Sequence, residues 1–222
     1  MSWDPPSDGP SPDAEAADEA LHADLAELVS ERGAVLLDAL ESHYPGSRDH
    51  ADATASYAFG AAVELRFERE HAEAVRETAR LHEAGMLYVP AAVLAARPED
   101  RDAEAQALID AHPRHGADLA RGAGVPAPSC KWIAATAERF DGRGPSGLAG
   151  ERVPLEARII RVACACDRVL TAPHPHLQAS VAEHRATAFA TLRATGSREL
   201  DPRVVAALTG MLERVSRGAN PA

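Results

Sequence analysis

The sequence predicts an all-α protein. Hydrophobic residues make up 45% of its 222 residues, whereas aromatic residues make up only 4%. Alanine is the dominant apolar residue and β-branched residues are sparse outside short runs, a composition that favours helices over sheets. No alternation of apolar and polar residues persists long enough for a strand, and no internal repeat is present. The length suits one hydrophobic core with an appendage.

The N-terminal part of the chain divides into an acidic tail and a helix. Residues 1–20 contain four prolines and six acidic residues, with no lysine or arginine. Such a segment cannot bury enough apolar surface to fold alone, so we expect it to be disordered. Leucine and valine at helical spacing then predict an N-terminal helix over 21–42, which Gly33 interrupts.

Residues 43–216 are predicted to form the main domain. After a break at Pro45 and Gly46, helices are predicted over 50–67 and 69–83, with Gly85 as the C-cap signal of the second. The segment 156–170 is the most apolar and should form the central, buried helix. The remaining predicted elements are a short helix between Pro90 and Pro98, helices over 102–111, 129–140, 178–194 and 201–216, a loop at 173–176, and a flexible tail over 217–222.

Charge and composition exclude several classes of protein. The net charge of −11 argues against direct nucleic-acid binding, because phosphate contacts need clustered lysine and arginine. Three cysteines do not make a disulfide framework. No apolar run approaches the length of a membrane span, and no apolar leader begins the sequence. We therefore expect a cytoplasmic protein with no membrane association.

Five side chains spread over the predicted helices carry groups that bind metals. Imidazole, carboxylate and thiolate are the usual ligands of first-row metals, and helical bundles build such sites in their cores. The spacing alone is weak evidence, because ten histidines allow many accidental combinations. Packing at helix ends and in the core is the structural alternative. The five candidates are His50, His82, Glu83, His112 and Cys164.

The order of the motifs strengthens the metal hypothesis. The chain reads LHEAGMLYVPAAVL, AHPRHG, ERFDGRG with GLAGERVPLEARII, and VACACD. This series resembles the HD-GYP family of the HD phosphohydrolase superfamily over roughly residues 50–210. Members hydrolyse cyclic di-GMP on a helical bundle that holds two or three metal ions, often iron or manganese. The resemblance implies an HD-domain helical bundle with extra C-terminal helices and, in this chain, an N-terminal helical extension.

The resemblance carries part of the family's metal site onto this sequence. The family's opening histidine falls on His50, and the histidine before proline in a later motif falls on His112. The His-Asp pair that names the superfamily falls on His82 and Glu83, which would then be vestiges of the catalytic pair. The aspartate that closes the metal site falls on Cys164.

Other family residues are missing. A His-His pair falls on Thr136 and Ala137, the lysine after the His-Asp pair falls on Met86, and the tyrosine of GYP is deleted between Gly144 and Pro145. Two ions need a bridging carboxylate and enough ligands for both, so we expect no metal or one divalent ion. Zinc suits a site with a thiolate, and iron or manganese are the family's metals.

Two classes of function follow. The leading hypothesis is a degenerate HD-GYP-like signalling domain with little or no cyclic di-GMP phosphodiesterase activity. It would bind a signalling protein, a nucleotide or a second copy of itself as a homodimer, with Arg143 and Gly144 of the glycine-rich loop as candidate ligand-binding residues. The alternative is a mononuclear metal-dependent phosphohydrolase that acts on a nucleotide or cyclic dinucleotide. A third hypothesis, a purely structural partner domain, places the contact in residues 1–42.

Overall fold

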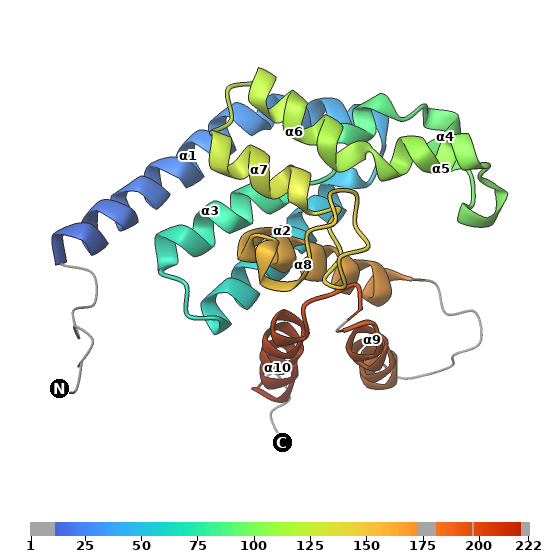
Figure 1. The fold of residues 1–222 in the computed structure, drawn as a ribbon. Coiled ribbons are helices and arrows are strands. Elements are labelled where there is room, and N and C mark those ends of the chain that lie inside the picture. The colour runs from blue at the N-terminus through green and yellow to red at the C-terminus, as the bar shows by residue number, and fades with distance from the viewer. Residues whose placement is uncertain (1–11, 173–180, 197, 219–222) are drawn as a thin grey trace, which may run out of the picture.

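The computed structural model describes residues 12–172, 181–196 and 198–218 (Figure 1). These residues form ten α-helices and three short 3-10 helices and contain no β-strand, which confirms the predicted all-α class. In chain order the elements are α1 (Pro12–His43), α2 (Ser47–Glu64), α3 (Arg69–Arg80), η1 (Ala84–Tyr88), α4 (Ala91–Ala95), η2 (Pro98–Asp100), α5 (Ala103–Asp110), α6 (His112–Gly122), α7 (Ala127–Ala135), η3 (Gly150–Arg152), α8 (Leu155–Thr171), α9 (Val181–Thr195) and α10 (Pro202–Gly218).

The first helix is longer than predicted. It begins at Pro12, inside the segment 1–20 that was expected to be disordered, and continues through Gly33 to His43. Proline is tolerated in a first helical turn, and acidic residues are favourable at the positive end of the helix dipole. Residues 1–11 lie outside the described residues. Neither this long helix nor any other in the described part combines the length and apolarity that crossing a bilayer requires.

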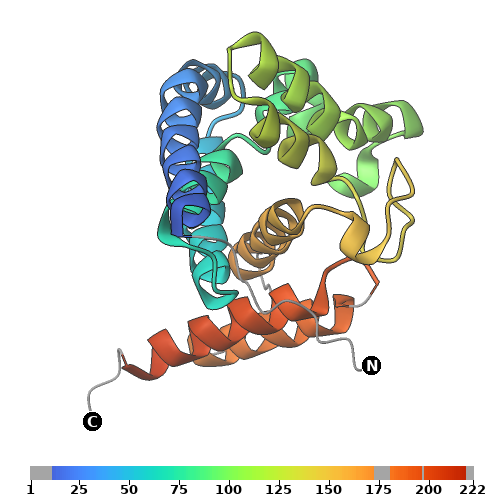
Figure 2. The ribbon, with the colours of Figure 1, turned by 60° about the vertical axis from the view of Figure 1, so that its left-hand side comes forward.

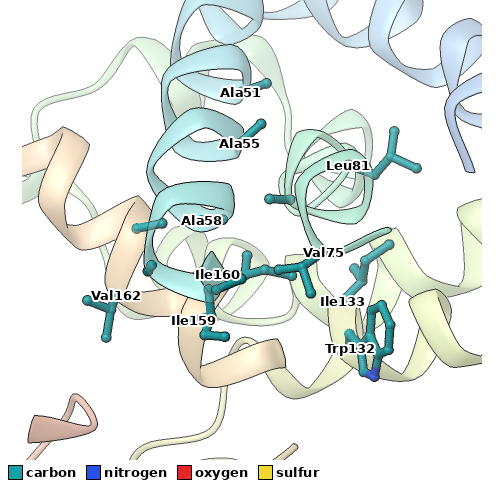
Figure 3. Close-up of a cluster of buried hydrophobic side chains, with 14 of the residues drawn as sticks. Ala51, Ala55, Ala58, Val75, Leu81, Trp132, Ile133, Ile159, Ile160 and Val162 are labelled. Atoms are coloured by element: carbon teal, nitrogen blue, oxygen red, sulfur yellow. The ribbon is translucent and has the colours of Figure 1, made fainter. Parts of the chain in front are cut away.

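A core rich in small side chains lies between α2, α3, α7 and α8 (Figure 3). Ala55 and Ala58 on α2 are almost fully buried, as are Val75 on α3 and Ile159 and Ile160 on α8. The alanines of α2 bring its backbone close to α3 and α8, both of which it contacts extensively. The prediction that residues 156–170 form the central helix is therefore confirmed.

The last two helices form a separate layer on the bundle (Figures 1 and 2). Helix α9 packs on α8, and α10 packs on α2 and α9. Asp201, at the start of α10, is buried and pairs with Arg158 of α8, and it also accepts a hydrogen bond from the backbone N–H of Arg203 at 2.8 Å. This ion pair ties the extra C-terminal helices to the central helix. The predicted loop at 173–176 and residues 219–222 of the predicted tail lie outside the described residues.

Several boundaries differ from those predicted. Helix α3 ends at Arg80 and not at residue 83, and α7 ends at Ala135, five residues before the predicted end at 140. Helix α6 was not predicted, because Pro113 looks like a break in the sequence. In the structure this proline lies in the first helical turn, where its missing N–H leaves no bond unmade.

Gly85 is not the predicted C-cap of α3. It lies inside η1, and its backbone contacts the start of α6. A Cβ atom at this position would lie 1.9 Å from the carbonyl oxygen of His112 and 2.5 Å from the backbone nitrogen of Gly116. The glycine is therefore required by the close approach of two backbones.

Replacing Gly85 with alanine should destabilise the protein by about 3 kcal/mol, because the clash is with backbone atoms that cannot rotate away. Urea unfolding of the variant measures this. Gly122→Ala is the matched control, since a Cβ there meets nothing within 4 Å and alanine favours helix. An equal loss of stability in both variants would contradict the packing argument.

Candidate metal centre

Four potential metal ligands converge where α2, the turn after α3 and α8 meet. His50 comes from α2, His82 and Glu83 from the turn, and Cys164 from α8, and one donor atom of each lies within 4.8 Å of all the others. The Nε2 atom of His50 is 3.7 Å from Oε1 of Glu83 and 3.7 Å from Sγ of Cys164. The structure thus brings together four of the five predicted metal-binding residues.

The turn that follows α3 positions His82 and Glu83. Leu81 follows the last helical residue and is buried at 1% exposure, which anchors the turn in the core. His82 and Glu83 come next and are also buried. On α8, Cys164 and Asp167 are three residues apart, so they lie on the same face toward His50. Cys166 lies fully buried in the hydrophobic core.

Both imidazole rings are already oriented for metal binding. Nδ1 of His82 donates a hydrogen bond to the carbonyl oxygen of Ala79 at 2.7 Å, and Nδ1 of His50 donates to Oδ2 of Asp167 at 2.6 Å. The Nε2 atom of His82 is buried and has no hydrogen-bond partner among the described residues. A metal-ligating histidine characteristically donates its other ring N–H to a carbonyl or carboxylate, which directs the free nitrogen at the ion.

The electrostatic environment sets the protonation of these groups. Burial lowers the pKa of His82 to about 4. Burial raises the pKa of Glu83, but His82, His50 and Arg168 outweigh it and bring it to about 2. Burial raises the pKa of Cys164 to about 12. At neutral pH, His82 and Glu83 are therefore ready to bind a cation, whereas Cys164 must first lose its proton.

The donor set fits one ion of the zinc type. With metal–ligand bonds of about 2.0–2.3 Å, tetrahedral donors lie roughly 3.3–3.8 Å apart, close to the 3.7 Å separations seen around His50. The unpartnered Nε2 of His82 and the mixture of imidazole, carboxylate and thiol support the same conclusion. Glu83 also accepts a hydrogen bond from Nη2 of Arg168 at 2.7 Å, so Arg168 competes with an ion for this carboxylate.

His112, the fifth predicted ligand, lies outside the group of four. Its Nδ1 donates to the carbonyl oxygen of Ile109 at 2.6 Å, and burial lowers its pKa. It lines a cavity together with Thr136 and Ala137, the positions on which the resemblance places the family's His-His pair. The hydroxyl of Thr136 donates to the carbonyl oxygen of Ile133 at 2.7 Å. This side of the site therefore offers the imidazole of His112, whereas Thr136 and Ala137 offer none.

Two cavities flank the four donors. The first, of about 660 Å³, is lined by His50 and Glu83 among others, and the second, of about 790 Å³, by His82 and Cys164. Arg101, Ile109 and Arg168 line both cavities, so the two meet at these residues. The donor group is thus approachable from two sides.

The glycine-rich loop borders the second cavity. Arg143 and Gly144, the predicted ligand-binding residues, both line it. A Cβ atom at Gly144 would lie 2.7 Å from Cα of Glu138, so this glycine is needed for the loop's own packing. Nε and Nη2 of Arg139 donate to Asp141 at 3.0 and 2.8 Å, and this pair stabilises the loop. A role of Arg143 and Gly144 in binding stays a prediction.

Sequence reasoning assigned no role to three residues of this site. Asp167 orients His50, and Arg168 holds Glu83. The spacing of Asp167 from Cys164 on an apolar helix was a usable signal, because residues three apart share a face. Arg101 carries no sequence signal, since it lies in a short connection between η2 and α5.

The sequence profile of the HD domain family matches residues 34–204, most of the chain. This chain belongs to the HD-domain family. The cyclic di-GMP phosphodiesterase response regulator RpfG of Xanthomonas campestris pv. campestris is 34% identical over 155 residues, which cover 66% of this chain and 38% of RpfG. The HD-domain chain thus spans well under half the length of this curated relative. The predicted resemblance to HD-GYP proteins is confirmed.

Solved structures share the HD-domain fold. An HDG"Y"P protein from Bdellovibrio bacteriovorus matches with a TM-score of 0.60 at 20% identity, over 75% of this chain and 52% of that one. The L. monocytogenes phosphodiesterase PgpH HD domain in complex with cyclic-di-AMP matches with a TM-score of 0.59 at 15% identity, over 83% and 97% of the two chains. A cyclic GMP-AMP specific phosphodiesterase of V. cholerae matches with a TM-score of 0.59 at 20% identity, over 91% and 51%. These identities support a common fold.

The buried imidazole of His82 should make the metal-free protein sensitive to acid. Its pKa is lowered from 6.5 to about 4, so below pH 6.5 the unfolded chain takes up a proton that the folded chain does not. The free energy of unfolding should therefore fall by about 3 kcal/mol as the pH is lowered from about 6.5 to about 4. Urea unfolding across this range measures the slope, which should be smaller in His82→Gln. An unchanged slope in that variant would contradict the assignment.

Zinc binding should release a proton from Cys164. Because burial raises the pKa of this thiol to about 12, it is protonated at pH 7 until the ion binds. Calorimetric titration in buffers of different ionisation enthalpy should show about one proton fewer released by Cys164→Ser than by the wild type. Cys166→Ser is the control and should release as many protons as the wild type. Equal release by all three proteins would exclude Cys164 as a ligand.

Proposed function

We propose that this chain is a one-metal HD-GYP-type domain that binds a phosphate-containing nucleotide as a signal and has little or no phosphodiesterase activity. One observation carries the proposal. The donor atoms of His50, His82, Glu83 and Cys164 lie within 4.8 Å of one another, whereas Thr136 and Ala137 stand where the resemblance places the family's His-His pair.

The residue types argue against a two-metal reaction. A pair of ions a few ångströms apart needs a carboxylate that bridges them and ligands for both. Cys164 occupies the position that the resemblance assigns to the closing aspartate, and a single sulfur does not replace the two oxygens of a carboxylate. His112, the remaining predicted imidazole ligand, lies outside the group of four, and the neighbouring cavity residues Thr136 and Ala137 offer no second imidazole. These features support a single ion.

The chain's own residues would prepare this site for the ion. Asp167 keeps the proton of His50 on Nδ1, and the carbonyl of Ala79 does the same for His82. His82, His50 and Arg168 together lower the pKa of the buried Glu83 carboxyl, and Arg168 also donates a hydrogen bond to it. A divalent ion held here would supply Lewis-acid chemistry, polarising a phosphoryl oxygen and lowering the pKa of water.

The charge of the second cavity supports an anionic ligand. Five arginines line it, and Asp110 is the acidic side chain among the residues that do so. This concentration is unusual on a chain with a net charge of −11. Phosphate groups are the anions that arginine recognises best, because the planar guanidinium donates two parallel hydrogen bonds. RpfG is named for cyclic di-GMP and one structural neighbour for its complex with cyclic-di-AMP, which makes cyclic dinucleotides the first ligands to test.

A mononuclear phosphohydrolase is the second candidate. Catalytic zinc sites use three protein ligands and keep one position open, whereas structural sites use four. If Arg168 retained Glu83, the ion would have three ligands and an open position facing the cavities. The Glu83–Arg168 ion pair is the specific observation that favours this alternative.

Purified protein reconstituted with zinc should bind about one ion per chain, and His82→Ala should lose it. His115→Ala is the matched control, because His115 lies outside the group of four. The loaded wild type should bind cyclic di-GMP in a calorimetric titration and leave it intact when the mixture is analysed by chromatography. Circular dichroism verifies that both variants are folded.

Two ions per chain, or zinc-dependent hydrolysis that His82→Ala abolishes, would reject the non-hydrolytic proposal. Hydrolysis with one ion per chain would favour the mononuclear phosphohydrolase. Absence of zinc in the reconstituted wild type would reject both.

A further inference from the structure

We propose that Arg101 is the anion-binding residue of this site and binds a phosphate group where the two cavities meet. Arg101 lies between η2 and α5, and its side chain lines both cavities. The first cavity also contains His50 and Glu83, and the second contains His82 and Cys164. A ligand group held by Arg101 would therefore share its cavity with the metal-binding residues on either side.

Arg101 has a buried donor without an acceptor. Its Nε atom is buried and has no hydrogen-bond partner among the described residues. Burying a guanidinium N–H without an acceptor is unfavourable, so most such groups in folded proteins are paired. An anion that enters the cavity would supply the missing acceptor.

Three other arginines of the second cavity are held by groups of the protein itself. Arg139 pairs with Asp141 and Glu199. Arg161 donates to the carbonyl oxygen of Thr136 at 2.9 Å, and Arg168 pairs with Glu83. These charges are partly neutralised by the protein itself. In the described part of the chain neither Arg101 nor Arg143 shows an ion pair, and of these two Arg101 is the one that also lines the first cavity and has a buried Nε without a partner.

Acidic residues line both cavities: Asp110 the second, and Asp49, Glu83 and Asp167 the first. Glu83 pairs with Arg168 and Asp167 pairs with His50. Oδ1 of Asp110 accepts a hydrogen bond from Nε2 of Gln106 at 2.7 Å. Met86 lines the first cavity together with Arg101, at the position where the resemblance assigns a lysine. The cation that is missing at Met86 would thus be supplied from a different segment of the chain.

Phosphate is the ligand group that suits this arrangement. A guanidinium binds phosphate through two parallel charge-assisted hydrogen bonds, which a single buried Nε and its neighbouring Nη can provide. This inference deepens the proposed function, because it names the residue that would recognise the phosphate of the nucleotide. It requires the anion and does not require the metal.

The test is a calorimetric titration of metal-free protein with inorganic phosphate, followed by the same titration with cyclic di-GMP. Arg101→Ala should weaken phosphate binding by about tenfold, which is the effect expected for losing a hydrogen bond to a charged group. Arg101→Lys should recover part of the affinity, since lysine retains the charge but not the two parallel donors. Arg121→Ala is the control, because Arg121 is exposed on α6 and pairs with Asp118.

Thermal unfolding provides a second measurement. Phosphate should raise the melting temperature of the wild type and of Arg121→Ala, and at the same concentration it should raise that of Arg101→Ala less, because binding is about tenfold weaker. The proposal is overturned if the wild type does not bind phosphate, or if Arg101→Ala binds it as tightly as the wild type. Zinc content separates this result from the proposed function. Loss of phosphate binding in Arg101→Ala with no bound zinc in the wild type would retain the anion site and reject the one-metal domain.

Discussion

The site depends on the close contact between the backbone of η1 and the start of α6. No side chain fits between Gly85 and the carbonyl oxygen of His112, so the turn that precedes Gly85 has one position relative to α6. That turn carries His82 and Glu83. Because Leu81 is also buried in the core, the turn is held from both sides, and its two polar side chains are directed at α2 and α8. Every other feature of the candidate metal centre builds on this placement.

Burying polar groups at this junction is unfavourable, and the surrounding residues offset the cost in two ways. Hydrogen bonds from His50 to Asp167 and from His82 to Ala79 satisfy one nitrogen of each ring, and Arg168 neutralises Glu83. What remains without a partner among the described residues is Nε2 of His82, whereas the thiol of Cys164 has a long contact of 3.7 Å with Nε2 of His50. An ion bound here would satisfy both groups, which gives these buried donors a physical role in the folded chain.

Much of the fold could be predicted because it depends on local pattern. Apolar spacing identified the central helix α8, and composition identified the all-α class. Helix α6 was missed, since Pro113 breaks a helix in its interior but not in its first turn, and the sequence does not say which applies. The N-terminal helix was predicted to begin at residue 21, whereas α1 begins at Pro12. A segment that cannot fold alone can still extend a helix that the rest of the chain stabilises.

The sequence by itself determined the inventory of this protein: which donors exist, which family ligands are missing, and that the chain is helical. Only the tertiary structure decided which donors meet. His50 and Cys164 are separated by more than a hundred residues, and no pattern within either helix reveals that they come within 3.7 Å of each other. The sequence also does not show that His112 lies outside the group of four donors. Nor does it show that Nε of Arg101 is buried without a partner among the described residues. The physical reason is that distances between helices are set by how their side chains pack, and packing involves the whole chain at once.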